Sequence, residues 1–274
     1  MGTLKTTLLM IAMMLLFMYI GNMINGTEGM TTAFYAACAT NIFSYFFSDT
    51  MVLNHYKAHV IKEKDNPELY QIVKNLSQRA GLPMPKVCIV PESVPNAFAT
   101  GRNPKHAAVA VTQGLLQTVN KEELEGVLAH EMSHINHHDI LIGTIASVFA
   151  GAITMIGNFA RLGTSNRQGQ HRGNNIMLVI MAPIAASLIQ MCISRTREYE
   201  ADAGAAKLTG HPEWLIAALE KLENYAKSNA MSRATPQTAH MFIVNPFSGI
   251  PGILSSLFST HPSTKNRIER LRRL

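Results

Sequence analysis

The stretch His130-Glu131-Met132-Ser133-His134 decides how this sequence is interpreted. It continues an apolar pattern of helical period, and two histidines four residues apart on a helix point the same way. Two imidazoles placed like this can bind one zinc ion. Glu131, beside the first of them, can activate a water molecule on that zinc. The stretch therefore predicts a zinc-dependent hydrolase, most readily a peptidase.

A catalytic zinc takes a third protein ligand and keeps one position for water. His137 and His138 are close in sequence, but one helix does not easily wrap three histidines around a tetrahedral ion. A carboxylate from a second helix is easier to place, and Glu198 is the best candidate. Asp202 follows it on the same helix face and can accept a hydrogen bond from the outer nitrogen of a ligand histidine. The alternative for this pair is a solvated helix face.

The composition favours a membrane protein. The 274 residues are 47% hydrophobic and only 15% charged, with a mean hydropathy of +0.08, which is unusual for a soluble domain. The net charge of +6 does not predict a nucleic-acid partner, because the basic residues flank apolar segments or cluster at the C-terminus. That cluster predicts contact with anionic lipid head groups and comprises Lys265, Arg267, Arg270, Arg272 and Arg273.

Three scattered cysteines predict neither a disulfide framework nor a thiolate zinc site. They are Cys38, Cys88 and Cys192.

Four apolar stretches are long enough to cross a bilayer as helices: residues 6–24, 31–53, 140–160 and 174–194. The first could be a cleaved signal peptide. A retained hairpin is favoured, because its apolar core is long and the second stretch follows at once. For the third and fourth stretches the alternative is a pair of buried core helices.

These stretches divide the chain into four parts. Residues 1–53 form a membrane hairpin, 54–139 the first part of a catalytic domain, 140–194 a second membrane or membrane-embedded hairpin, and 195–274 the rest of the domain. Two crossings between His134 and Glu198 would return both ligand helices to one membrane face.

The basic residues indicate that this face is cytoplasmic. Lysines follow the second stretch and arginines follow the fourth. The loop between the third and fourth stretches opposes this orientation, because it carries Arg161, Arg167 and Arg172 and no acid.

The polar parts predict a mainly α-helical domain with a small β-sheet. A helix is expected from Asn66-Pro67 to Gly81, and another after a capping box of Asn120 and Glu123. Short β-rich runs at 86–90, 96–101 and 107–112 predict strands, the last two paired.

Two further sites are predicted beside the metal. His261 is the candidate donor to the oxyanion that forms during hydrolysis; its alternative is a loop histidine bonded to local backbone. The strand that begins Asn96-Ala97-Phe98 could pair with an extended substrate by strand addition. The alternative for it is an ordinary hairpin strand.

Taken together, these motifs resemble the HtpX-type membrane zinc metalloproteases, which are related to the CAAX prenyl proteases. The resemblance covers essentially the whole chain. It rests on the two N-terminal apolar stretches, residues 96–101, 130–134 with Asp139 shortly after, 194–202 and 242–246, and the terminal Thr260-His261-Pro262. A lone HExxH motif is a weak signal. Together with these apolar stretches and the downstream acidic segment, it is a specific one.

The resemblance implies a zincin-like fold with one Zn²⁺ held by His130, His134 and Glu198. It also implies Glu131 as the base, Asp202 behind the ligands, and the strand at Asn96-Ala97-Phe98 as the substrate edge. It further implies a multi-pass protein of a prokaryotic cytoplasmic membrane, with its active site in the cytosol. Its expected substrates are misfolded or damaged membrane proteins and unfolded polypeptides, in quality control under stress.

Three rival functions are weaker. An intramembrane protease carries its HExxH motif inside an apolar span, but here charged residues flank the motif. A CAAX-type processing protease would share the zinc chemistry but require a prenylated tail. A non-catalytic membrane scaffold would be expected to have lost Glu131, which is present.

Overall fold

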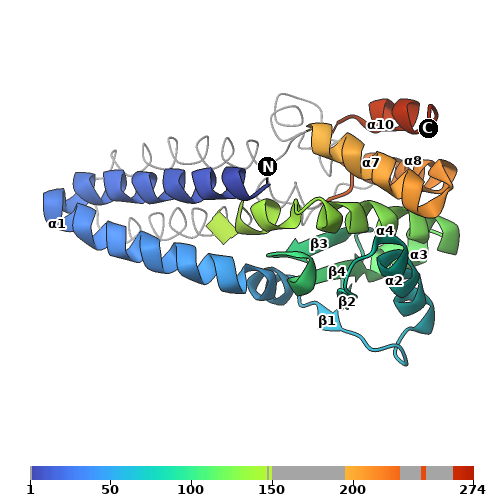
Figure 1. Cartoon of the computed structure of the whole chain (residues 1–274), viewed down its shortest axis with the longest axis horizontal. Helices are drawn as coiled ribbons and strands as arrows, with labels where there is room; N and C mark the ends of the chain where they lie inside the picture. The colour runs from blue at the N-terminus through green and yellow to red at the C-terminus, as the bar shows by residue number, and fades with distance from the viewer. Residues whose placement is uncertain (1, 147, 150–194, 229–241, 245–261) are drawn as a thin grey trace.

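The computed structural model describes residues 2–146, 148–149, 195–228, 242–244 and 262–274 (Figure 1). The fourth predicted membrane segment, most of the third, Cys192 and His261 lie outside these residues. The described part is mostly helical with one small mixed sheet.

The N-terminal helix α1 (Gly2–His55) is folded into a hairpin that projects away from the rest of the molecule (Figure 1). Its helical backbone breaks at Asn25 and Gly26, and Gly26 has a φ of 56°, which glycine adopts at little cost. The arms meet closely near this turn, where a Cβ on Gly21 would lie 2.4 Å from the Gly29 oxygen. The predicted helices at 6–24 and 31–53 are the two arms.

The sheet contains β1 (His59–Val60), β2 (Lys86–Val90), β3 (Ala97–Gly101) and β4 (Ala107–Thr112), in the order β1-β2-β4-β3. β3 runs antiparallel to β4, as predicted, and β2 runs parallel to β4. The two-residue β1 was not predicted, because it is too short for an alternating pattern. Among the residues that the structure describes, β3 is last in this order and is therefore an edge strand.

Helices cover one face of the sheet and the end of the hairpin covers the other. α2 (Pro67–Ala80), α4 (Lys121–Asn136) and α8 (Pro212–Ser228) share a core with the first face. On the other face, Val52 and Leu53 of α1 pack against Cys88 and Phe98. The predicted helix signals are confirmed: the Asn66 side chain caps α2, Gly81 ends it in the left-handed region, and Asn120 and Glu123 form the capping box of α4.

Four further elements belong to the described part of the body: η1 (Pro104–His106), α3 (Gln113–Thr118), α7 (Arg195–Thr209) and α10 (Thr264–Leu271). α7 lies along α4, and α10 packs on α7 and α8 (Figure 1).

The chain becomes helical again at Ile140, and this helix packs on the first hairpin arm. Leu141, Ile142 and Ile145 form a buried cluster with Leu9 and Met13 of α1. Within the described residues, the segment Leu4–Met23 is long and apolar enough to cross a membrane.

The C-terminal basic residues do not all face outward. Arg267 on α10 is only 1% exposed, so the expectation that it meets lipid head groups is wrong; its guanidinium is hydrogen-bonded inside the protein. Arg270 lies over the Tyr199 ring at 3.8 Å, and Arg272 is 3.6 Å from Glu220.

Candidate metal centre

Helix α4 presents two of the candidate ligands. The rings of His130 and His134 lie on one face of the helix, with their Nε2 atoms 3.2 Å apart and their planes nearly perpendicular at 89°. His130 is buried and His134 is half-buried. Residues i and i+4 of a helix lie one above the other, so the sequence spacing fixes this arrangement.

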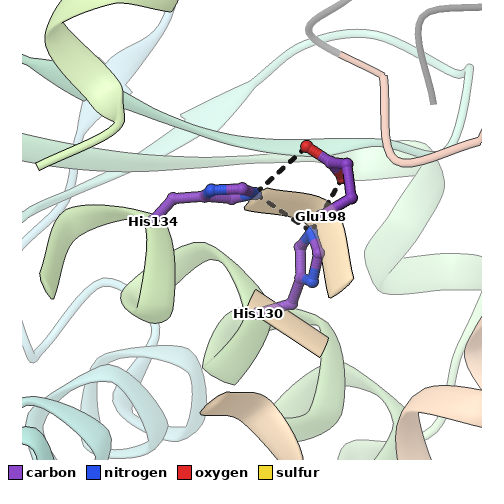
Figure 2. Close-up of side chains that lie close together, drawn as sticks. All are labelled: His130, His134 and Glu198. Carbon is purple, nitrogen blue, oxygen red and sulfur yellow. Dashed lines mark hydrogen bonds and ion pairs between the residues drawn. The ribbon is translucent and has the colours of Figure 1, made fainter. Parts of the chain in front are cut away.

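Helix α7 supplies the carboxylate. The Oε2 of Glu198 lies 3.6 Å from His130 Nε2, and its Oε1 lies 3.6 Å from His134 Nε2 (Figure 2). The two helices cross closely because α7 has a glycine at the contact: a Cβ on Gly204 would lie 2.4 Å from the Ser133 hydroxyl oxygen. A small residue at this position therefore brings Glu198 to the histidines.

The three side chains fit a zinc ion. Their donor atoms lie within 4.8 Å of one another, and the nearest nitrogen and oxygen pairs are separated by 3.2 and 3.6 Å. Tetrahedral zinc with bonds of about 2.0–2.1 Å places its ligand atoms about 3.3 Å apart. Two imidazoles and a carboxylate are also a donor set that zinc accepts, with a fourth position left for water.

The rival ligands do not join this group. His138 is exposed, has a φ of 60°, and its Nδ1 lies 3.1 Å from the Asn136 carbonyl oxygen. His137 is exposed just past the end of α4. In the part of the chain that the structure describes, the possible metal group consists of His130, His134 and Glu198.

A buried ion pair lies behind His130. Asp202 Oδ1 is 3.0 Å from His130 Nδ1, as predicted from its spacing to Glu198. Arg267 binds the same carboxylate through two nitrogens, at 2.9 and 2.7 Å, and also donates to the Ile243 carbonyl at 2.8 Å. The C-terminal helix is thus joined to the metal centre through one arginine.

These contacts change the protonation of His130 and Asp202. Burial alone would lower the pKa of His130, but hydrogen bonds to Asp202 and Glu198 outweigh it and raise the pKa to about 9. Burial would raise the pKa of Asp202, but Arg267 and His130 outweigh it and hold the pKa well below its usual value. Asp202 is therefore an anion that directs the Nδ1–H of His130 and leaves Nε2 to the metal.

A second carboxylate lies behind His134. Asp139 Oδ2 is 3.5 Å from His134 Nδ1, and Asp139 Oδ1 is 3.3 Å from an Arg197 nitrogen. Burial would raise the pKa of Asp139, but His134 and Arg197 outweigh it and lower the pKa. Each candidate histidine ligand therefore has an acid at its outer nitrogen.

Glu131 lies between the candidate ligands and the edge strand. It is 7% exposed, and its Oε2 accepts a hydrogen bond from the Ala99 backbone N–H at 2.8 Å. The Asn96 carbonyl accepts from Thr112 N–H, so alternate residues of β3 bond inward to β4. Ala97 and Ala99 direct their backbone groups outward, toward the side where Glu131 lies.

The predicted substrate residues have distinct places on this strand. Asn96 is buried, and its Oδ1 accepts from the Ile243 N–H at 3.1 Å, so its side chain anchors the segment 242–244. Ala97 packs in the core shared with α4, and Phe98 faces the end of the hairpin.

Arg267, Asp139, Arg197 and the Ala99 backbone belong to this site but were given no role in it from the sequence. Asp139 offered a signal, because an acid five residues past His134 can turn back toward it. Arg267 offered none, because it is 65 residues from its partner Asp202.

Comparisons with known proteins agree with this geometry. The sequence profile of peptidase family M48 matches residues 63–274. The chain is 58% identical over 275 residues to the "Protease HtpX homolog" of Campylobacter curvus (strain 525.92), covering 98% of this chain and 96% of that protein. It is 50% identical over 280 residues to the "Protease HtpX homolog" of Thermococcus sibiricus (strain DSM 12597 / MM 739), covering 99% and 95%.

The fold also matches a solved structure. The crystal structure of S. mikatae Ste24p aligns with a TM-score of 0.55 and 18% sequence identity. The match covers 95% of this chain but 62% of the Ste24p chain, so this chain spans less than two thirds of that protein. At this identity the likeness is one of fold.

Proposed function

Since the chain belongs to peptidase family M48 and is a metalloprotease, we propose that it is a zinc-dependent endopeptidase of a prokaryotic cytoplasmic membrane. Its substrates are misfolded or damaged membrane proteins. One observation carries this proposal: the group of His130, His134 and Glu198 lies beside Glu131, and Glu131 lies against an edge strand. A metal site, a base and a peptide-binding edge are thereby brought together.

Zinc held by the two Nε2 atoms and the Glu198 carboxylate would supply a Lewis acid that polarises the scissile carbonyl and acidifies water. Glu131 then takes a proton from the attacking water on its Oε2 and passes it to the leaving amine. Asp202 holds the outer nitrogen of His130, and the Asp139 carboxylate lies 3.5 Å from that of His134, so that both Nε2 atoms can be directed at the metal.

The peptide binds in extended form along β3. The outward backbone groups of Ala97 and the outward carbonyl of Ala99 offer hydrogen bonds that do not depend on substrate side chains. The hydrogen bond from the Ala99 N–H to Glu131 holds the base beside this edge, and so beside a peptide bound there. An edge of this kind suits unfolded segments of many sequences, as quality control requires.

The hairpin supports placement in a membrane. Of the seventeen large hydrophobic side chains that are exposed within the described residues, fourteen lie on α1. Exposed apolar surface on this scale marks a membrane or protein contact. The first arm, residues 2–24, is about 35 Å long at 1.5 Å per residue, which matches a hydrocarbon core of about 30 Å. The chain is therefore proposed to cross the membrane several times, with its body in the cytoplasm.

The test compares zinc content and casein cleavage of three purified proteins in detergent. Wild type is expected to hold one zinc and cleave casein. Glu131→Gln is expected to keep zinc and lose cleavage, and Glu198→Ala to lose both. Cleavage by Glu131→Gln at the wild-type rate would refute the role of this carboxylate. Full zinc content in Glu198→Ala would refute the ligand set.

A further inference from the structure

A cleft of about 180 Å³ lies between the end of the hairpin and the start of the edge strand. Its walls are mostly apolar: Tyr56 just after α1, Val94 from the loop before β3, Phe98 from β3, and Phe242. Glu92 and His55 are its charged or titratable members. Neither the proposed chemistry nor the core packing accounts for this cleft.

Two of its walls are next in sequence to residues that are hydrogen-bonded to the candidate site. Phe98 precedes Ala99, whose N–H donates to Glu131. Phe242 precedes Ile243, whose carbonyl accepts from Arg267 while that arginine holds Asp202 against His130. The cleft is therefore tied through short backbone links to both the base and a metal ligand.

The cleft lies on a face of the sheet that side chains of a peptide paired with β3 would reach. A peptide paired with the outer edge of β3 directs alternate side chains to the two faces of the sheet. One face is covered by α4, where Ala97 packs. The other is the face of Phe98, where the cleft lies.

The loop that forms the cleft wall is well fixed. The Glu92 carbonyl accepts from the Gly114 N–H at 2.9 Å, and the Thr112 hydroxyl accepts from the Asn96 N–H at 2.8 Å. Gly114 is required for this contact, because a Cβ there would lie 2.0 Å from the Ser93 oxygen. A preformed cleft of this kind can discriminate between side chains, since binding does not have to order it.

We infer that this cleft is a specificity subsite that receives one large apolar side chain, aromatic or aliphatic, of the bound polypeptide. Its aromatic and aliphatic walls favour such a side chain, and the Glu92 carboxylate disfavours an acidic one. The inference rests on the proposed peptidase function. The edge of β3 contacts only the substrate backbone, whereas the cleft would add a side-chain preference at one substrate position.

The experiment uses the zinc-loaded full-length protein and a series of peptides. Each peptide carries a single phenylalanine at a successive position of an alanine background, with glutamate in a parallel series. At one position, wild type is expected to prefer phenylalanine to alanine in kcat/KM by about 10- to 100-fold, the range for filling an apolar pocket. Glutamate at that position is expected to be the poorest.

Val94→Trp fills the cleft and is expected to abolish this preference, while cleavage of the all-alanine peptide and zinc content persist. Ser93→Trp is the matched control, because Ser93 is exposed in the same loop, and it is expected to keep the preference. Phe242→Ala enlarges the cleft and is expected to shift the preference from phenylalanine to tryptophan.

The outcomes separate the two proposals. Cleavage by wild type without preference at any position, or a preference that survives Val94→Trp, would overturn the subsite and leave the peptidase intact. If zinc-loaded wild type cleaves no peptide and no casein, the proposed function itself fails.

Discussion

Arg267 connects the C-terminal helix to the metal centre. Its guanidinium binds Asp202 with two hydrogen bonds and reaches the Ile243 carbonyl, which couples three separate segments of the chain. A planar guanidinium makes such paired bonds to a carboxylate, which the point charge of lysine does not. The arginine therefore fixes Asp202, and through it the ring of His130.

Arg267→Met removes this charge and keeps most of the stem. It leaves the Asp202 carboxylate buried without its cation, which costs about 3–5 kcal/mol of stability. It also releases the orientation of His130, so zinc affinity should fall about 10- to 100-fold. Chemical unfolding and competitive zinc titration measure the two effects. Arg273→Met, at an exposed position next to α10, is the control; equal behaviour of the two variants would contradict this role.

A zinc ion bound at the proposed site would have to displace a proton from His130. The pKa of His130 is raised from 6.5 to about 9 in the metal-free protein. The stability from this protonated contact is therefore fully present below pH 6.5 and is lost as pH rises through about 9. Near neutral pH, each zinc should release about one proton, and zinc affinity should increase with pH up to that value.

Calorimetric titration of zinc in two buffers of different ionisation enthalpy measures this release. The apparent binding enthalpy should differ between the buffers by about the difference for one proton. Equal enthalpies in the two buffers would show that His130 is already deprotonated before zinc binds.

The grouping of the candidate ligands could be predicted from the sequence better than their surroundings could. His130 and His134, and likewise Glu198 and Asp202, are four residues apart on single helices, so their shared faces follow from helix geometry. Arg267 depends on how α10 packs against α7, and no local pattern encodes that contact. Because Arg267 lies in a basic C-terminal cluster, it was instead predicted to contact lipid head groups.

At the level of elements, the crossing of α4 and α7 sets the distance between the histidines and Glu198. Gly204 makes this crossing possible, because any side chain there meets Ser133. The glycine therefore acts on the site although it touches none of the candidate ligands.

Gly204→Val should push α7 away from α4. The expected cost is about 1–3 kcal/mol of stability from overpacking, with weaker zinc binding because Glu198 moves away from the two Nε2 atoms. Ala203→Val introduces the same branched side chain at an exposed neighbouring position of α7 and is expected to bind zinc as wild type does. Zinc titration of both variants checks this, and equal affinities would contradict the role of the crossing.

Local signals also explain which elements were predicted. The caps of α2 and α4 and the antiparallel pairing of β3 with β4 involve residues close in sequence. The parallel pairing of β2 with β4 and the addition of β1 join residues that are more distant. Neither pairing produces a local pattern of apolar and polar residues from which it could be predicted.

At the scale of the whole molecule, an apolar hairpin carries a polar catalytic body. The hairpin ends at the face of the sheet opposite α4, and its last residues line the cleft beside β3. Composition and hydropathy predicted the two arms, whereas their docking on the sheet depends on contacts between distant segments.

The proposed orientation places the hairpin turn across the membrane from the catalytic body. In a background without native cysteines, Thr27→Cys at the turn should react with an impermeant thiol reagent added outside intact cells. Lys64→Cys, at an exposed position of the body, should react only after the cells are opened. Labelling of both positions from the same side would contradict a hairpin that crosses the membrane.

The central claim is that one zinc ion is shared by His130, His134 and Glu198. X-ray absorption at the zinc edge, on wild type and Glu198→Ala loaded with one equivalent, tests it most directly. Wild type should give two imidazole nitrogens and a carboxylate oxygen at about 2.0–2.1 Å, and Glu198→Ala should lose the bound zinc or that oxygen. A third imidazole in wild type, or an unchanged spectrum in Glu198→Ala, would contradict the claim.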